Sequence, residues 1–381
     1  MRQRRVCVVV SARPSYSRVK TALQAMQAHP ALELQVVATA SALLERYGGV
    51  VHMMESEGIP ITARAATVVD GHTPTTMATS TGVALLKLVS VLENLEPDVV
   101  VTVADRYETL ATATAAAYMN IPLAHLQGGE LTGSVDEKVR HAVTKLANLH
   151  FVSTPRAAQR VLAMGEEPNS VFVTGCPSID LAAQIKNYAT DRRRLLEPYG
   201  CPDLRADYVV VLQHPVSTQC EQAQRQMLET LHGVEACGVV AVVFQPNEDA
   251  GSESTARAIA AFRAARHGDR FFYVDNMRPM DFLRLLDGSR SLVGNSSVGI
   301  RECSYLGVPV VNIGSRQLHR ERGANVLDAP HDRAAIAKAL GRQIDSGRYA
   351  RDALYGSGGA GEKIAAILAD VSLSIEKSFA D

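Results

Sequence analysis

The sequence predicts an α/β protein with two parallel-sheet domains, each covered by helices on both faces. Short valine-rich runs alternate along the chain with longer helical segments, and these runs are apolar throughout. Continuous apolar strands are typical of parallel sheets that are buried on both faces. The length of 381 residues also exceeds what one ordinary core holds, which favours two domains.

The composition excludes several classes of function. Hydrophobic residues make up 46% of the chain and charged residues 21%, with a formal net charge of -1. This balance is typical of a globular protein and gives no basic field for a nucleic-acid or membrane partner. The first apolar run, Val6–Val10, is too short for a signal peptide or a membrane span, so we expect a cytoplasmic protein.

Cysteines and carboxylates give no sign of a metal site. The six cysteines are scattered, with no CxxC pair and no zinc-like spacing, which fits free thiols in a reducing compartment. No Asp-x-Asp sequence occurs, so the usual carboxylate pair for a metal-bound sugar nucleotide is missing. We therefore expect no metal, with arginines and backbone dipoles to neutralise any anionic ligand.

The first half of the chain alternates strands and helices. The predicted strands are Val6–Val10, Leu34–Ala38, Asp98–Val103, a short run that ends at His125, His150–Ser153 and Val171–Thr174. The predicted helices are a segment that follows the loop 11–17 and reaches Ala28, Thr73–Leu95, a segment after Arg106, a segment after Gly133 and Pro155–Met164. Residues 1–180 form the first predicted domain, and a polar, irregular linker over 181–205 follows it.

The loop after the first strand is a candidate anion site. It lacks the G-x-G-x-x-G fingerprint, so no dinucleotide cofactor is predicted. Arg13 and Ser17 instead stand at the start of a helix, where backbone N–H groups and the helix dipole favour an anion. A serine that only caps the helix is the alternative.

Two consecutive strand ends of the first half bring polar side chains to one place. Asp105 and Arg106 follow one strand, and Gln127 and Glu130 follow the next. Ligands bind beyond the carboxyl ends of strands in open α/β sheets, so the site is predicted here.

These groups also have structural alternatives. Asp105 and Glu108 have the spacing of a helix capping box. Asp136 and Arg140, four residues apart on the next predicted helix, also fit a solvated, ion-paired face. The argument for function is that these groups converge on adjacent strand ends.

The second half repeats the pattern over 206–355, which predicts a second Rossmann-like domain. Its predicted strands are Tyr208–Leu212, which His214 follows, Val239–Phe244, Arg270–Val274, a strand that ends at Gly294, and Val308–Ile313. Its predicted helices are Gln219–Cys237, Ser254–Arg266 and a helix that Asn295 opens.

The strand end at Gly294 is a candidate phosphate cradle. Asn295, Ser296 and Ser297 offer short polar side chains and exposed backbone N–H groups, and no P-loop lysine follows. Glu302, one turn into the helix, can accept from a ribose diol, and Arg316 after the next strand can clamp a diphosphate. A simple serine N-cap explains one serine but not the whole cluster.

In this order, the motifs resemble the UDP-N-acetylglucosamine 2-epimerase family, and within it the hydrolysing enzymes of sialic-acid-type biosynthesis. The resemblance covers about residues 10 to 325. The matching segments are Arg13-Pro-Ser-Tyr-Ser-Arg18, Asp105-Arg106, His125-x-x-Gly-Gly-Glu130, Gly133-Ser-Val-Asp-Glu-Lys-Val-Arg-His-Ala-Val-Thr-Lys145, Gly175-Cys-Pro-Ser178, His214-Pro215, Gly294-Asn-Ser-Ser-x-Gly-Ile-Arg-Glu302 and Asn312-Ile-Gly-Ser-Arg-Gln317.

The resemblance implies a GT-B-like fold, in which two Rossmann-like domains face across a cleft and the second holds most of the nucleotide. By analogy, the C-terminal segment 356–381 carries a helix that packs back on the first domain, and the protein is a homodimer or homotetramer. Family members eliminate UDP across C1–C2 in the anti sense to give 2-acetamidoglucal. Water then adds in the hydrolysing branch, and UDP adds back in the non-hydrolysing branch.

The resemblance also assigns roles to residues. Asp105 and Asp136 match the acid/base carboxylates, and Arg140 and His214 are expected at the diphosphate and the leaving group. The residues expected to bind UDP or the sugar are Arg13, Ser17, Arg106, Asn295, Ser296, Ser297, Glu302 and Arg316.

The chain departs from the family pattern at two positions, where Ala104 replaces a glycine and Gln127 replaces a catalytic glutamate. An amide cannot accept a proton as a carboxylate does. Either Asp105, Asp136 or Glu130 takes that role, or Gln127 only orients substrate or water, or the substrate differs.

Together these observations predict a hydrolysing 2-epimerase of UDP-GlcNAc or a close UDP-2-acetamido sugar, without metal or cofactor, which releases UDP and a ManNAc-type sugar. The alternatives are a non-hydrolysing epimerase, a GT-B glycosyltransferase, and a nucleotide-sugar binder without turnover.

Overall fold

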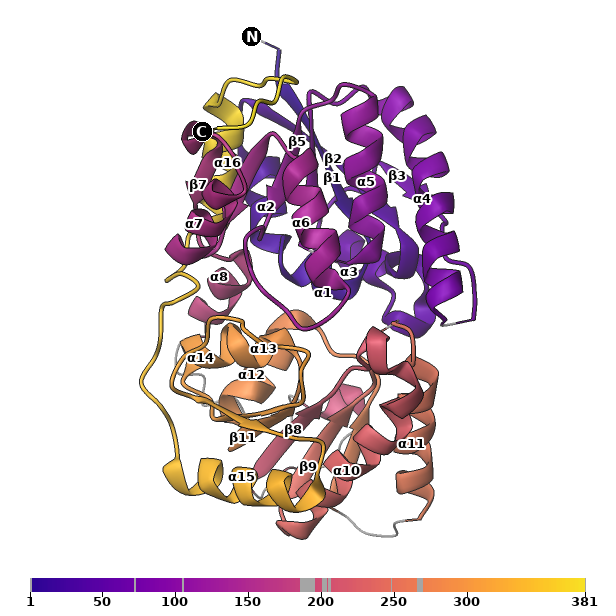
Figure 1. Cartoon of the computed structure of the whole chain (residues 1–381), viewed down its shortest axis with the longest axis vertical. Coiled ribbons are helices and arrows are strands. Elements are labelled where there is room, and N and C mark those ends of the chain that lie inside the picture. The colour runs from indigo at the N-terminus through magenta and orange to yellow at the C-terminus, as the bar shows by residue number, and fades with distance from the viewer. Residues whose placement is uncertain are drawn as a thin grey trace.

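Two α/β domains stack along the long axis of the molecule (Figure 1). The computed structural model describes residues 2–380 apart from 72, 105, 186–195, 201–203, 205–206, 248 and 266–269. Each domain holds one parallel sheet with helices on both faces, which confirms the predicted fold class.

The first sheet has seven parallel strands in the order β3-β2-β1-β4-β5-β6-β7. The strands are β1 (Arg4–Val10), β2 (Leu32–Thr39), β3 (Ala63–Ala65), β4 (Val99–Val103), β5 (Leu123–Leu126), β6 (Leu149–Val152) and β7 (Val171–Val173). The helices are α1 (Arg13–Ser17), α2 (Lys20–Ala28), α3 (Val50–Ser56), α4 (Pro74–Leu95), α5 (Tyr107–Tyr118), α6 (Asp136–Leu146), α7 (Pro155–Ala163) and α8 (Pro177–Ala183). One core face packs against α2 and α3, and the other against α4, α5 and α6.

The second sheet has six parallel strands in the order β10-β9-β8-β11-β12-β13. The strands are β8 (Tyr208–Leu212), β9 (Val240–Phe244), β10 (Phe271–Val274), β11 (Ser291–Gly294), β12 (Val310–Ile313) and β13 (Val326–Ala329). The helices are α10 (Ala223–Ala236), α11 (Ser252–Ala264), α12 (Pro279–Gly288), α13 (Ser297–Ile300), α14 (Glu302–Leu306) and α15 (Arg333–Ser346). Helices α10, α11 and α15 cover one face, and α12 and α14 cover the other.

The chain passes between the domains twice, and the two passages touch. The backbone N–H of Cys176 donates to the carbonyl of Tyr355 at 2.8 Å. Part of the predicted linker lies outside the described residues, but α8 on its near side contributes Leu181 and Ala182 to the core of the second domain. The returning chain then forms α16 (Ala360–Asp370) on the first domain.

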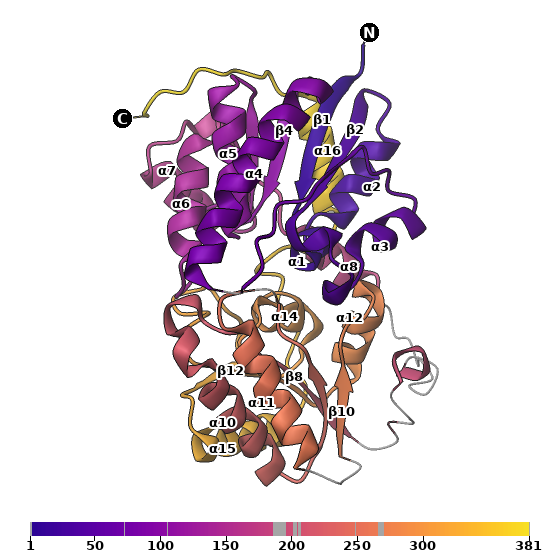
Figure 2. The ribbon, with the colours of Figure 1, turned by 90° about the vertical axis from the view of Figure 1, so that its right-hand side faces the viewer.

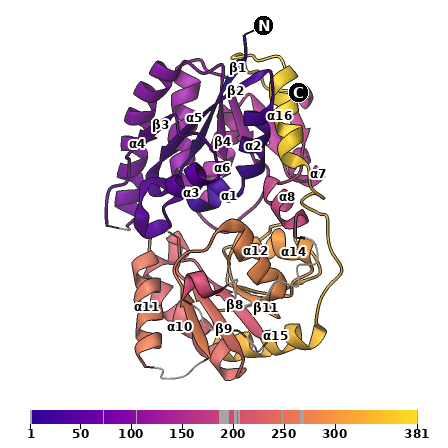
Figure 3. The same cartoon turned by 180° about the vertical axis from the view of Figure 1, so that it is seen from behind.

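Helix α16 packs against α2 and β1 of the first domain (Figures 2 and 3). A Cβ at Gly361 would lie 2.5 Å from the backbone of Thr21, so glycine permits the close approach of the two helices. The Asp180 carboxylate accepts from the backbone N–H groups of Ala360 and Gly361 and so caps the helix.

One local prediction differs from the structure. Residues 13–17 were expected in a loop but form the short helix α1, because Pro14 favours the first turn of a helix. The helix expected within 356–381 is α16, which ends at Asp370, and the described residues after it are not helical.

Helix α4 is long and apolar enough to pass a composition test for a membrane span, with a mean hydropathy of 1.4 and 22% of the tested window buried. In the fold it is a covering helix, since Ala84, Leu88 and Leu92 pack on the first sheet.

Candidate active site

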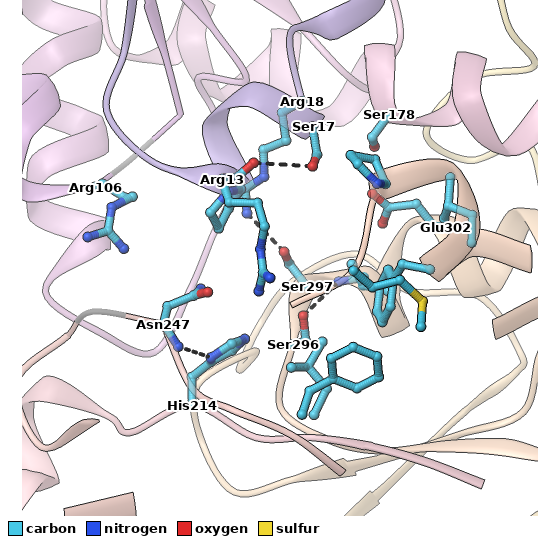
Figure 4. Close-up of a pocket in the computed structure, with 18 of the residues that line it drawn as sticks. Arg13, Ser17, Arg18, Arg106, Ser178, His214, Asn247, Ser296, Ser297 and Glu302 are labelled. Atoms are coloured by element: carbon cyan, nitrogen blue, oxygen red, sulfur yellow. Dashed lines mark hydrogen bonds between the residues drawn. The ribbon is translucent and has the colours of Figure 1, made fainter. Parts of the chain in front are cut away.

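A pocket lies between the two domains, at the carboxyl ends of the strands of both sheets (Figure 4). First-domain residues reach it from the segments after β1, β4 and β5 and from α8, and second-domain residues from the ends of β8 to β12. This edge of an open α/β sheet is where ligands bind.

Four arginines make one part of the pocket strongly positive. Arg13, Arg18 and Arg106 come from the first domain, and Arg316 comes from the loop after β12. Burial lowers the pKa of Arg13 only to about 10, so its guanidinium stays charged at neutral pH. Guanidinium groups converging in a partly dry pocket suit a diphosphate, because each can donate two hydrogen bonds to its oxygens.

Serine hydroxyls face these arginines across the domain boundary. Arg18 Nη2 donates to Ser297 Oγ at 2.9 Å. Ser296 is the N-cap of α13 and accepts from the backbone N–H of Val298, which is the capping role considered as the alternative for one serine of this cluster. Ser17 also lines the pocket, with its hydroxyl donating to the Arg13 carbonyl at 3.1 Å.

His214, just after β8, is buried beside the arginines in its neutral form. Its Nδ1 accepts from the backbone N–H of Asn247 at 3.1 Å, so the ring proton is on Nε2 (Figure 4). Burial, followed by the charges of neighbouring arginines including Arg316 and Arg13, holds the pKa of His214 well below its usual range. His214 is therefore a hydrogen-bond donor without a charge at neutral pH.

Asn295 joins the two loops that carry His214 and Arg316. Its Oδ1 accepts from the His214 backbone N–H at 2.7 Å, and its Nδ2 donates to the His214 carbonyl at 2.8 Å. Its own carbonyl accepts from Arg316 Nη1 at 3.2 Å. Asn295 is buried and does not line the pocket, so the structure gives it a positioning contact.

A second part of the pocket is apolar and belongs mostly to the second domain. The rings of Phe244 and Phe282 meet edge to face, with their centroids 5.1 Å apart. The other apolar residues around them are Leu212, Met277, Pro279, Leu283 and Val298. An apolar slot beside a few polar groups suits a planar ring.

Glu302 borders this slot at the first turn of α14. Ser178 lines the same part of the pocket, and Glu302 Oε2 has no hydrogen-bond partner among the residues described. Burial raises the pKa of Glu302 above its usual value, so the carboxylate gains from a ligand hydroxyl that donates to it.

Comparison with known proteins decides the family. The family model for UDP-N-acetylglucosamine 2-epimerase matches residues 24–369. The chain is 31% identical over 372 residues to the UDP-N,N'-diacetylbacillosamine 2-epimerase (hydrolyzing) of Legionella pneumophila, with 97% of each protein covered. The chain belongs to the UDP-N-acetylglucosamine 2-epimerase family.

Two further likenesses bear on this chain. It is 27% identical over 355 residues to the UDP-N-acetylglucosamine 2-epimerase of Neisseria meningitidis, covering 93% of this chain and 91% of the relative. The crystal structure of UDP-GlcNAc 2-epimerase from Neisseria meningitidis bound to UDP-GlcNAc superposes with a TM-score of 0.80 at 18% identity, covering 96% and 99% of the two chains. This likeness supports the GT-B-like fold.

The structure brings only some of the predicted acid/base residues to the pocket. Asp136 lines it from the first turn of α6. Asp105 is outside the described residues, directly before the pocket residue Arg106. Arg106 is the N-cap of α5 and forms ion pairs at 3.0 Å with Glu108 and with Asp249 of the second domain.

Arg140 and Glu130 lie behind the pocket instead of lining it. Arg140 is buried, and its Nη1 donates to the Glu130 carbonyl at 2.8 Å and to Glu137 at 3.2 Å. The Glu130 carboxylate pairs with Arg301 at 2.6 Å and Arg320 at 3.1 Å, and these charges hold its pKa at about 2 despite burial. The structure thus places Arg320 in an ion cluster with Glu130.

Gln127 is also buried behind the pocket. Its Nε2 donates to Cys176 Sγ at 3.1 Å, and its Oε1 has no partner among the residues described. The backbone of Gln127 has φ of 66°, and that of Gly129 has φ of 74°. A Cβ at Gly129 would lie 2.2 Å from the Ala157 carbonyl, so both the angle and the close approach require glycine at this position. This tight turn holds the Gln127 side chain away from the pocket-lining residues.

Sequence reasoning missed several residues of the pocket. Arg18 belongs to the motif Arg13-Pro-Ser-Tyr-Ser-Arg18, so its place in the motif was a signal. Asp249 follows strand β9, and Met277 and Phe282 of the apolar slot follow strand β10. The ends of these two strands hold no recognisable motif. Among the described residues, no group of three His, Cys, Asp or Glu side chains is placed to hold a metal ion.

Proposed function

We propose that this protein is a metal-independent, hydrolysing 2-epimerase that acts on UDP-GlcNAc or a close UDP-2-acetamido sugar. The observation that carries the proposal is the pocket itself, in which an arginine and serine cradle lies beside an apolar slot and a buried carboxylate in a chain of this family. The Legionella pneumophila relative, whose name states a hydrolysing reaction on UDP-N,N'-diacetylbacillosamine, supports the hydrolysing branch and a modified sugar as the second candidate substrate.

Different parts of the pocket suit the diphosphate, the uracil ring and the ribose of UDP. Arg13, Arg18 and Arg316, with the hydroxyls of Ser296 and Ser297, bind the diphosphate. The slot around Phe244 and Phe282 takes the uracil ring, and Glu302 accepts from the ribose diol. The sugar then extends toward Asp136 and Arg106 of the first domain, which line the pocket beside the arginines.

The first step is an anti elimination. A carboxylate, Asp105 or Asp136, takes the C2 proton as the C1–O bond breaks and UDP leaves, which produces 2-acetamidoglucal. The C2 proton is not acidified by an adjacent carbonyl, so its removal depends on stabilising the departing diphosphate. The arginines supply positive charge, and His214 Nε2–H supplies a neutral donor whose tautomer is fixed by Asn247.

The second step adds water across the same double bond. The water oxygen bonds to C1. A proton returns to C2 on the face opposite to the one from which the first proton was removed, and this inversion gives the manno configuration. Gln127 takes no proton in this scheme, because its amide is buried and donates to Cys176. Asp105 and Asp136 act in both steps. Glu130 and Arg140 do not contact the substrate, and their contacts with Arg301 and with each other stabilise the loop after β5.

Proton NMR in D₂O tests the proposal, with UDP-GlcNAc and UDP-N,N'-diacetylbacillosamine compared in the presence of EDTA. We expect free UDP and a manno-configured free sugar that carries deuterium at C2. UDP-ManNAc as product would assign the non-hydrolysing branch, and accumulation of 2-acetamidoglucal would mean that the second step fails. Transfer to an added acceptor without deuterium at C2 would indicate a glycosyltransferase, and tight UDP binding without turnover a nucleotide-sugar binder.

We also propose a cytoplasmic homodimer or homotetramer. The outer side of α4 supports the assembly, because Leu86 there is 75% exposed and Val89 is 38% exposed. Light scattering of the purified protein measures the state directly, and a monomer at micromolar concentration would contradict the proposal.

A further inference from the structure

The loop between β5 and α6 reaches from the first domain to the second (Figure 1). In this loop, the backbone N–H of Gly133 donates to the carbonyl oxygen of Arg316 at 3.2 Å. Beside it, Arg320 Nε donates to the carbonyl oxygen of Leu131 at 3.2 Å. Two hydrogen bonds to backbone carbonyls therefore join this loop to the loop after β12.

Each end of the contact at Gly133 adjoins a residue of the pocket. Asp136, three residues further along the chain, begins α6 and lines the pocket from the first domain. Arg316, whose carbonyl accepts the hydrogen bond, lines the pocket from the second domain. Gly133 itself does not line the pocket. The contact thus connects a candidate acid/base carboxylate to an arginine of the proposed diphosphate site.

The close approach of the two loops requires glycine at position 133. A Cβ there would lie 2.0 Å from the carbonyl oxygen of Ser315 and 3.2 Å from the Cβ of Leu318. The φ angle of Gly133 is not positive, so the backbone conformation alone would admit alanine. A contact between carbon and oxygen normally needs about 3.3 Å, so even a methyl group would force the two backbones apart by about 1 Å.

The loop after β12 is braced within its own domain. The carbonyl oxygen of Asn295, a buried residue, accepts from Arg316 Nη1 at 3.2 Å and from Gln317 Nε2 at 2.9 Å. Residues 131–136 of the first domain, by contrast, are all partly exposed. We therefore expect a side chain at position 133 to displace the first-domain loop, and Asp136 with it.

We infer that Gly133 is a positioning residue that sets the separation between Asp136 of the first domain and Arg316 of the second. The inference rests on the proposed function, in which Arg316 binds the departing diphosphate and Asp136 is one of the carboxylates that act at C2. Proton removal at C2 and loss of UDP from C1 occur together, so both groups must be in place at the same time. A displacement of about 1 Å can lower the rate by about a hundredfold.

The experiment compares Gly133→Ala with Gly341→Ala in the full chain. Gly341 lies in α15 (Arg333–Ser346), and a Cβ there would meet no atom within 4 Å, so it is a matched control. Gly133→Ala should lower kcat by about ten- to a hundredfold on whichever sugar nucleotide the wild type turns over, UDP-GlcNAc or UDP-N,N'-diacetylbacillosamine. Gly341→Ala should keep kcat within about twofold of the wild type.

Binding of UDP separates positioning from general damage. Isothermal titration calorimetry of Gly133→Ala should give a Kd for UDP within about threefold of the wild type, because Arg316 and the serines of the second domain stay in place. The binding stoichiometry should also be unchanged. Partial unfolding would instead reduce the stoichiometry and kcat together, and thermal melting of each variant shows whether it is folded.

Hydrogen exchange of the wild-type chain gives a second test that needs no variant. None of the residues 131–135 lines the pocket, so UDP does not cover them directly. UDP bound at Arg316 should hold the two loops together and slow amide exchange in segment 131–135 by at least about threefold. Segment 341–346 of α15 is the control and should exchange at the same rate with and without UDP.

Three results would overturn the inference. They are a folded Gly133→Ala with the kcat of the wild type, a loss of kcat matched by an equal loss of UDP affinity, and exchange in segment 131–135 that UDP does not slow. If Gly133→Ala does not fold, the exchange experiment decides. If the wild type binds UDP but turns over neither sugar nucleotide, the proposed function fails and the inference falls with it.

Discussion

The two domains meet through two sets of arginine contacts that use the same chemistry in different surroundings. The inner cluster, Glu130 with Arg301 and Arg320, has side chains no more than 2% exposed and lies near the contact between Cys176 and Tyr355. The outer contacts, Arg106 with Asp249 and Arg18 with Ser297, line the pocket.

The difference shows how one domain interface can both stabilise the fold and release some of its contacts to a ligand. The inner charges are buried together, so removal of Glu130 takes away the carboxylate that both buried arginines contact. The outer arginines contact acceptors that a phosphate group can replace, because both partners line the pocket. We therefore expect the inner cluster to set stability and the outer contacts to set affinity.

The largest effect expected is on the inner cluster. Glu130→Ala should lower the free energy of unfolding by about 3–5 kcal/mol, because two buried arginines lose their counter-charge. Asp249→Ala, which removes a partly exposed carboxylate, should cost about 1 kcal/mol or less. Urea denaturation followed by circular dichroism measures both, and equal losses would remove the distinction between the two sets.

Acid should weaken the inner cluster over a defined range of pH. The pKa of Glu130 in the folded protein is about 2, below its ordinary value of 4.5. A carboxylate with a depressed pKa stabilises the fold above its unfolded pKa, and this contribution is lost as pH falls from about 4.5 toward 2. Glu130→Gln should flatten the pH dependence of unfolding in that range, and an unchanged curve would assign acid sensitivity to other carboxylates.

On the pocket side, His214 should matter for turnover but not titrate near neutrality. His214→Phe removes the Nε2–H donor and should lower kcat by about a hundredfold, as for loss of one preorganised donor. Because the pKa of His214 is held low, wild-type kcat should show no ionisation of this residue between pH 6 and 8. A kinetic pKa near 6.5 that disappears in His214→Phe would contradict the neutral assignment.

The smallest effect expected is on the outer contacts. Asp249→Asn removes one of the two carboxylate charges that pair with Arg106, the one from the second domain, and should tighten UDP binding by up to about fivefold. Glu253→Gln, an exposed carboxylate on α11 that pairs with Arg257, is the matched control and should have no effect. Weaker binding in Asp249→Asn would mean that Asp249 orients Arg106 for the ligand instead of competing with it.

The same contrast explains how much the sequence could reveal. The fold class and the pocket positions of Arg13, Ser296 and Ser297 were predictable, because each of these residues lies just after an apolar strand in its own stretch of sequence. Glu130 follows such a strand end too, yet its carboxylate turns to Arg301 and Arg320 of the other domain. No local pattern encodes partners so distant in the chain.

Arg140 and the apolar slot show two further limits of prediction from sequence. Arg140 could pair with Asp136 or Glu137 by helical spacing alone, and the structure selects Glu137 at 3.2 Å. Phe244, Met277 and Phe282 look like ordinary core residues in sequence, and only the domain arrangement leaves them facing a pocket. Which apolar residues stay accessible is a property of tertiary packing.

The return of the chain to the first domain affects the order in which the protein can fold during synthesis. Ile364, Ala365 and Leu368 of α16 are buried in the core that β1 and α2 begin. A ribosome therefore completes the whole second domain before it releases the helix that closes the first. The nascent first domain waits with an open groove along α2, so the domain that is made first is the last to be finished.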